Sequence, residues 1–560
     1  MCKAAFKRMI GLAAGAWGLA GTAAAEIHPD PADRIAPAVQ LPAFIVRDNR
    51  VLPPRESWHY VAAPGLEALS TVSASETTQS FRDFFEFHRA LGAVWPLAQM
   101  NAAVPACLIL CGRQKQFAPF VPEADRAQAR GMLSVSYQDR ELSSIVIELD
   151  SGALQEQVDG ASEDMSQYTS DLIHREYVHF LLGRIGDRVP PWLEQGLWQV
   201  FLSMKTSGDL IGLPALSLPD ELAVRKKGAD TDLRAALQAG AFCSLEGLLT
   251  AKETPSELNH TPWASECYEL VHFCLVGEKG RYRPAFLQFA QLSSRLPPDE
   301  AMFRRCFGIG YAEFLIRLWR YTGWSADLAL EITDKTTGKG IPLPDFKARE
   351  ATDGEVGRIK GETLRMAGRL DEAHWALIAP YQRGSRDPQL LASLGLQEEA
   401  AHLPDRATPF LEAATAAYTT RARAWAMLGQ LRLAAALAHP SGPGGTLAAA
   451  QLKVILEPLF AGRALAPPLP ELYQTAAAAW SHSGIKPTAG HLALIDEGVA
   501  KFPFDADLVY ADARVHEQFG YLSRAQELCA LGEKYATRPE DRARLAELQH
   551  AWSSPAGGPP

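Results

Sequence analysis

The residues best suited to chemistry lie between Asp171 and Val200, in the stretch DLIHREYVHFLLGRIGDRVPPWLEQGLWQV. Glu176 and His179 are three residues apart, so a helix places their side chains on one face. A histidine can bind zinc, and a neighbouring glutamate can activate a metal-bound water for hydrolysis. These are residue types of a hydrolytic zinc site, but the pair alone does not predict one.

The stretch resembles the active-site region of gluzincins, zinc peptidases of the MA-like group. In their HExxH motif, two histidines four residues apart bind zinc, and the glutamate beside the first is the general base. Glu176 and His179 hold the positions of the base and the second ligand, but Arg175 stands where the first histidine would be. Further on, PPWLEQGLW resembles the family's PxWLxEGLA segment, and Gln195 replaces the glutamate that is the third ligand.

Two of the three ligand positions are therefore lost. Arginine has no lone pair to give a metal and would repel it, so we expect Arg175 to pair with Glu176 or Glu194 instead. Glu194 is also the substitute ligand that an altered zinc site would use. His174 and His179 are five residues apart and turn about 140° from each other along a helix, so they cannot chelate one ion.

The resemblance covers roughly residues 40–325 and implies an α+β domain in which a small mixed sheet is followed by helices. It implies an edge strand that lies alongside an extended substrate. With its ligands lost, the domain is expected to be a catalytically silent pseudopeptidase with no cofactor. The alternative is an exported zinc metalloendopeptidase with an altered ligand set. A third interpretation is an unrelated amphipathic helix that carries Arg175 on its surface.

Composition and charge limit the class of protein. The chain has 560 residues, of which 47% are hydrophobic and 21% charged, as in ordinary globular proteins of two or three domains. Its formal net charge is -10 and it has no long basic run, which argues against nucleic acid as the main partner. Beyond the N-terminal segment, no stretch has the apolar length of a membrane span.

The N-terminal segment, residues 1–25, has the layout of a secretory signal peptide. Basic residues precede an apolar run from Met9 to Leu19, and Ala23-Ala24-Ala25 supplies small residues for cleavage before Glu26. We therefore expect an exported protein, periplasmic or extracellular.

Two further parts precede a linker. Residues 26–150 form the N-terminal α/β part; its pattern predicts a helix at 78–91, a buried strand at 106–111 and paired strands at 131–137 and 144–149. Residues 151–332 form a helical, peptidase-like part. Within it, His272 lies among apolar neighbours, as a core histidine does.

Residues 353–550 repeat a helical pattern that resembles tetratricopeptide units. The segment GRLDEA at 368–373 is similar to GYLSRA at 520–525, and WAMLG at 425–429 matches the W-x2-LG opening of the repeat. An insertion, HPSGPGG at 439–445, interrupts the period. We expect four to five imperfect repeats.

Such repeats stack into an all-α solenoid whose concave face suits protein or peptide partners. The predicted function is therefore to bind or scaffold such partners through the repeats and the vestigial substrate groove. A solenoid that only caps the first domain, and an adaptor whose front half is structural, are the alternatives. The Gly- and Pro-rich segment 333–352 is the predicted linker, and 551–560 the predicted disordered tail.

Overall fold

The computed structural model describes residues 41–42, 52, 54–95, 104–149, 165–182, 189–214, 243–251, 262–322, 328–332, 340–536 and 538–553. The chain divides into two compact units, Met1–Leu41 and Pro42–Pro560, and the description below concerns the second. The predicted signal peptide, 1–25, lies outside the described residues, as does 554–560 of the predicted tail.

A six-stranded mixed sheet lies at the centre of the first half. Its strands run in the order β4-β5-β3-β2-β1-β9. Strand β3 is parallel to both of its neighbours, whereas β4–β5, β2–β1 and β1–β9 are antiparallel. The bounds are β1 His59–Ala63, β2 Leu66–Ser70, β3 Ala106–Cys111, β4 Ser134–Gln138, β5 Ser143–Glu148 and β9 Arg349–Glu350. The predicted strand at 106–111 and the predicted pair after it are confirmed.

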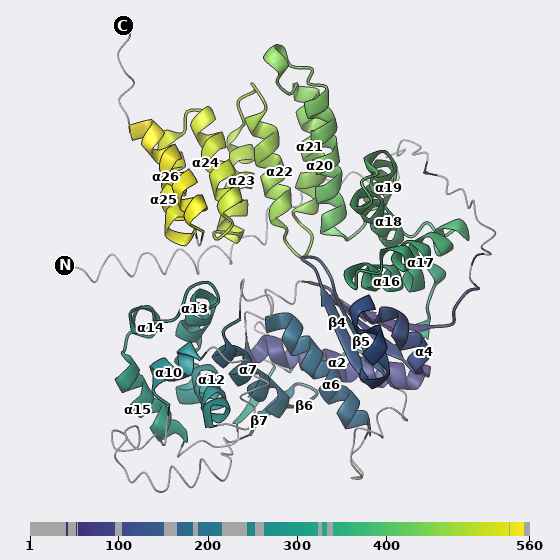
Figure 1. The fold of residues 1–560 in the computed structure, drawn as a ribbon, viewed down its shortest axis with the longest axis vertical. Coiled ribbons are helices and arrows are strands. Elements are labelled where there is room, and N and C mark those ends of the chain that lie inside the picture. Colours follow the sequence, from purple (N-terminus) through teal and green to yellow (C-terminus); the bar gives the residue numbers. More distant parts are fainter. Residues whose placement is uncertain are drawn as a thin grey trace. The chain divides into compact units, whose positions relative to one another are not determined.

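Helices make up most of the remaining described structure (Figure 1). Around and after the sheet these are α2 Ala74–Val94, α4 Gln114–Phe117, α6 Met165–Leu182, α7 Pro191–Ser203, α10 Leu245–Thr250, α12 Pro262–Gly280, α13 Arg283–Ser293, α14 Glu300–Phe307 and α15 Tyr311–Thr322. The later helices are α16 Asp353–Met366, α17 Leu370–Gln382, α18 Pro388–Ala400, α19 Pro404–Ala416, α20 Ala422–Ala438, α21 Ala449–Gly462, α22 Pro470–Ser481, α23 Ala489–Lys501, α24 Ala506–Gln518, α25 Leu522–Tyr535 and α26 Pro539–Ser553. Short 3-10 helices are η2 Ala118–Phe120, η3 Glu123–Gly131 and η4 Pro443–Gly445.

Both faces of the sheet are buried, which explains why β3 reads as an unbroken apolar run. Successive side chains of a strand face opposite sides. Leu108 and Leu110 belong to the core shared with α2 and α6, whereas Ile109 and Cys111 belong to the core shared with α16. The sheet therefore holds α6 on one face and the first repeat helix on the other.

The part predicted as wholly helical, 151–332, contains a second sheet. Strands β6 Lys205–Ser207, β7 Leu210–Leu213 and β8 Leu328–Glu331 pair antiparallel in that order. The two-residue connection begins with Gly208, whose φ of 64° suits a tight hairpin turn. The helical prediction was wrong here, because strands of three and four residues are too short to show a period.

Helices α16 to α26 form an array of antiparallel pairs, which confirms the predicted helical repeat region. The described residues contain five successive pairs, from α16–α17 to α24–α25, and a final helix α26. Gly368 and Gly520 end the first helix of their pairs with φ values of 75° and 85°. Within the first pair, a Cβ on Gly361 would lie 2.6 Å from Leu377 Cγ, so glycine permits the close approach.

A buried arginine joins the turn between β4 and β5 to this array. The Arg421 side chain is 5% exposed and donates to Glu141 Oε2 and Glu362 Oε1 at 2.7 Å each, and to Ser393 Oγ at 2.8 Å. Burial alone would raise the pKa of Glu362, but the charges of Arg421 and Arg365 outweigh it and lower that pKa. The hairpin turn and the first repeats therefore pack through compensated charges.

No helix in the described ranges combines the length and apolar character needed to cross a membrane.

Candidate functional site

The predicted site residues of the first motif lie on helix α6. Its apolar face, with Ile173, Tyr177 and Val178, is buried in the core shared with α2 and the sheet. The other face lies beside the edge strand β4. Glu176 points toward that strand, while the side chains of Arg175 and His179 are about half exposed.

Both carboxylate oxygens of Glu176 are bonded to β4. Oε1 accepts a hydrogen bond from Ser134 Oγ at 2.8 Å, and Oε2 accepts one from Ser136 Oγ at 2.7 Å. The two serines are alternate residues of the strand, so their side chains share one face. The residue is 9% exposed. Through its two hydrogen bonds, this buried carboxylate connects helix α6 to the sheet. Sequence reasoning placed the serines in a strand but missed their role.

Arg175 stays beside the glutamate that follows it. Its Nη2 lies 3.6 Å from Glu176 Oε1, and its side chain is 48% exposed. The pairing with Glu176 was expected, and solvent weakens it at this exposure. At the position that the resemblance assigns to the first zinc ligand, the chain thus carries a half-exposed cation.

His179 contacts the second motif rather than Glu176. Its Nδ1 lies 3.5 Å from Glu194 Oε1, and its ring centroid is 4.9 Å from that of Trp198 on α7. Gln195, at the position that the resemblance assigns to the third ligand, is 3% exposed. The next residue, Gly196, fits tightly against α12, since a Cβ there would lie 2.4 Å from Val271 Cγ2. The glycine of the second motif therefore has a packing reason of its own.

His174 is separated from this group, as its spacing requires. Its ring stacks on Phe87 at a centroid distance of 3.7 Å and an interplanar angle of 13°. Burial lowers the pKa of His174 to about 4, which marks a neutral core imidazole.

A metal site needs several ligand atoms close together, and few side chains in the described part of the chain meet this condition. There, one trio of His, Cys, Asp or Glu side chains has ligand atoms that all lie within 4.8 Å of one another: Asp496, Asp512 and His516 in the repeat array. Glu176, His179 and Glu194 do not form such a trio. In this conformation, the altered ligand set would need side chains to move before it could hold zinc.

Strand β4 lies next to Glu176 and ends the sheet, so no strand of the described residues pairs with its outer edge. The hydrogen bond from Glu148 N to Leu133 O fixes the ladder with β5, so Val135 is also bonded to β5. In an antiparallel pair the intervening residues point their N–H and C=O groups outward. Ser134, Ser136 and Gln138 are those residues, so the serines that hold Glu176 also belong to the outer edge.

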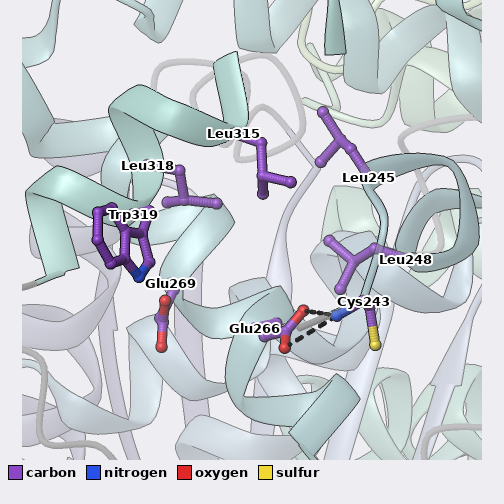
Figure 2. Close-up of a pocket in the computed structure, with 8 residues that line it drawn as sticks. All are labelled: Cys243, Leu245, Leu248, Glu266, Glu269, Leu315, Leu318 and Trp319. Atoms are coloured by element: carbon purple, nitrogen blue, oxygen red, sulfur yellow. Dashed lines mark hydrogen bonds between the residues drawn. The ribbon is translucent and has the colours of Figure 1, made fainter. Parts of the chain in front are cut away.

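A small hollow is lined by residues of α10, α12 and α15 and by Cys243 (Figure 2). It measures about 10 Å³, which is room for no more than one water. The Glu266 carboxylate at its wall accepts hydrogen bonds from the backbone N–H of Cys243 at 3.0 and 3.2 Å (Figure 2). This hollow is part of the core and not a ligand site.

No protein-family model matches this chain, and no curated protein does. Among solved structures, the MamA protein is 15% identical, with 37% of this chain and 98% of that chain covered and a TM-score of 0.26. A thermophilic TPR protein from Thermus thermophilus is 17% identical, with 35% and 99% covered and a TM-score of 0.26. The site described above rests on the chain's own contacts.

Proposed function

We propose that this chain is a non-catalytic pseudopeptidase that binds or scaffolds protein or peptide partners, through its helical repeats and through the open edge of β4. The observation that supports the absence of catalysis in this proposal is the hydrogen bonding of the Glu176 carboxylate. Both of its carboxylate oxygens accept hydrogen bonds from serine hydroxyls, and Arg175 Nη2 lies 3.6 Å from Oε1.

A working zinc peptidase needs its glutamate to reach a metal-bound water. Here the carboxylate is turned to the sheet, and the neighbouring guanidinium cannot bind a metal. If Glu176 instead served as a substitute ligand, the site would lose its base. The altered-ligand alternative therefore lacks either a third ligand or a base.

The β4 edge supports the binding part of the proposal. Outward N–H and C=O groups on alternate residues are what an extended peptide uses when it adds a strand to a sheet. The edge is short, with Ser134, Ser136 and Gln138 as its outward residues, so we expect modest affinity. The partner class is an extended, β-prone peptide segment.

The repeat array supports a second contact with protein partners. Stacked helical pairs expose a continuous surface that a single helix cannot offer. The N-terminal segment adds the expectation that this binding takes place after export, in a periplasm or outside the cell.

Substitutions at Ser136 distinguish peptide binding at the β4 edge from binding elsewhere on the chain. Ser136→Pro removes an outward N–H and places a ring on the edge, while bonds to β5 are spared. Ser136→Ala is the matched control, because it loses the same hydroxyl but keeps the backbone. A fluorescein-labelled peptide rich in Val and Thr should bind the wild type and Ser136→Ala with equal affinity. Its affinity for Ser136→Pro should be lower by about tenfold or more. Equal binding to all three variants would refute the edge as the site.

A further inference from the structure

Three side chains that the proposed function does not use meet between the last repeats. Asp512 and His516 are one turn apart on α24, and Asp496 faces them from α23. His516 Nε2 lies 3.4 Å from Asp512 Oδ1 and 3.6 Å from Asp496 Oδ2. These separations are too long for good hydrogen bonds.

The two inner members of this trio are buried without hydrogen-bond partners. Asp512 is 0% exposed and His516 is 3% exposed. Neither carboxylate oxygen of Asp512 and neither ring nitrogen of His516 has a hydrogen-bond partner. Buried polar groups are nearly always satisfied, so four such atoms together call for a ligand. Burial, and after it the Asp496 carboxylate, raises the pKa of Asp512 to about 7.

The spacing fits a metal ion. Two ligand atoms on a tetrahedral zinc with bonds of about 2.0–2.1 Å lie roughly 3.3 Å apart. The measured separations of 3.4 and 3.6 Å around His516 Nε2 are close to this value. Imidazole with two carboxylates is a ligand set that zinc accepts.

The Arg524 side chain orients the Asp496 carboxylate. Arg524 donates to Asp496 Oδ1 through Nη2 at 2.7 Å and through Nε at 2.9 Å, which leaves Oδ2 toward His516. Hydrogen bonds to the free oxygen of a ligating carboxylate are typical around metal sites. The Asp496 side chain is 30% exposed, so the trio is open to solvent on its side.

We propose that Asp496, Asp512 and His516 bind a divalent transition-metal ion, with zinc as the best fit, and so fasten α23 to α24. A water completes the coordination on the solvent side. This proposal is independent of the proposed function, because the site lies in the repeats and not at the peptidase-like motif.

The test uses the full chain, stripped with a chelator and titrated with ZnCl₂ by calorimetry, with thermal unfolding recorded alongside. We expect one zinc per chain and a higher melting temperature with zinc. Asp512→Asn and His516→Gln should each weaken zinc binding about tenfold or more. His439→Gln, at an exposed histidine of the array, and His179→Ala should bind zinc as the wild type does.

The proposal would be overturned by a wild type that binds no zinc, by binding that survives Asp512→Asn, or by binding that His179→Ala abolishes. Because Asp512 is buried, Asp496→Asn at the open side is the second variant should Asp512→Asn fail to fold; zinc binding unchanged in Asp496→Asn would equally count against the site. Zinc binding lost with His179→Ala would also favour the peptidase alternative, whereas a wild type that binds no zinc would overturn the repeat site and leave the proposed function standing.

Discussion

The Oε1 atom of Glu176 accepts a hydrogen bond from the hydroxyl of Ser134 at 2.8 Å, across the junction of helix α6 and strand β4. A general base has to present an oxygen to the water that it deprotonates. Here Ser136 holds the other oxygen as well. The side chain that the sequence assigns to catalysis therefore acts as a contact between helix and sheet.

This contact should be measurable as stability. Replacing both serines, Ser134→Ala with Ser136→Ala, removes two hydrogen bonds to a poorly solvated carboxylate and should lower the free energy of unfolding by about 1–3 kcal/mol. Urea unfolding of the full chain measures the change. Ser523→Ala, at an exposed serine of the array, should change it by less than about 0.5 kcal/mol. A double variant as stable as this control would show that the bonds do not form.

Arg421 is expected to matter far more than surface arginines. Arg421→Met leaves Glu141, at 2% exposure, buried without its cation, and leaves Glu362, at 3% exposure, with Arg365 alone. Such a loss costs about 3–5 kcal/mol. The control is Arg514→Met, which breaks an exposed pair with Glu517 and should cost under about 1 kcal/mol. Similar unfolding midpoints in urea for both variants would disprove a buried network.

The same network predicts acid sensitivity. Glu362 has a lowered pKa in the folded chain because Arg421 and Arg365 outweigh the effect of burial. The stability that it contributes is fully present above the ordinary pKa of glutamate and is lost as the pH falls through the lower folded value. In Glu362→Gln, the free energy of unfolding should fall less steeply below about pH 4 than in the wild type. Parallel curves from urea unfolding at several pH values would count against this role.

His272 predicts a second pH dependence, in a different range. The ring is 1% exposed, its Nδ1 lies 2.9 Å from Tyr321 Oη, and burial lowers its pKa to about 4. The unfolded chain takes up a proton near its ordinary pKa, so stability is lost as the pH falls from about 6.5 toward 4. His272→Gln and His272→Leu should both reduce this loss by about 1–2 kcal/mol between pH 7.5 and 5. A slope that stays unchanged in both variants would mean that His272 titrates normally.

The ligand positions that the resemblance assigns to Arg175 and Gln195 can be tested by placing ligands there. Arg175 and His179 are four residues apart on α6, so Arg175→His puts two imidazoles on one face. Together with Gln195→Glu, this change should create zinc affinity that the parent lacks. The comparison is made in an Asp512→Asn background, which removes the site proposed in the repeats. No gain in zinc affinity would show that the motif alignment is in the wrong register.

Local patterns predicted local structure well. The apolar run at 106–111 became β3 with the same bounds, and the Gly-x-Leu segments at 368 and 520 became the turns between paired helices. In both cases the signal is carried by residues next to one another in the chain. The hairpin at 205–213 was not predicted, because its strands are too short to show an alternation of apolar and polar residues.

Contacts between distant residues could not be predicted in this way. Glu141 and Arg421 are 280 residues apart, and each looks like an ordinary surface charge in its own segment. The pairing of Glu176 with Ser134 and Ser136 likewise depends on how a helix lies on a strand. Asp512 and His516 have the spacing of a metal pair, but their burial and the approach of Asp496 become visible only in the fold.

The measurement that tests the central proposal most directly is a mass-spectrometric search for peptide cleavage by the full chain, with zinc supplied, beside the variant Glu176→Gln. The proposal predicts that the two proteins leave a pool of unstructured peptides equally intact. Cleavage by the wild type that Glu176→Gln abolishes would contradict it and would establish the zinc peptidase instead.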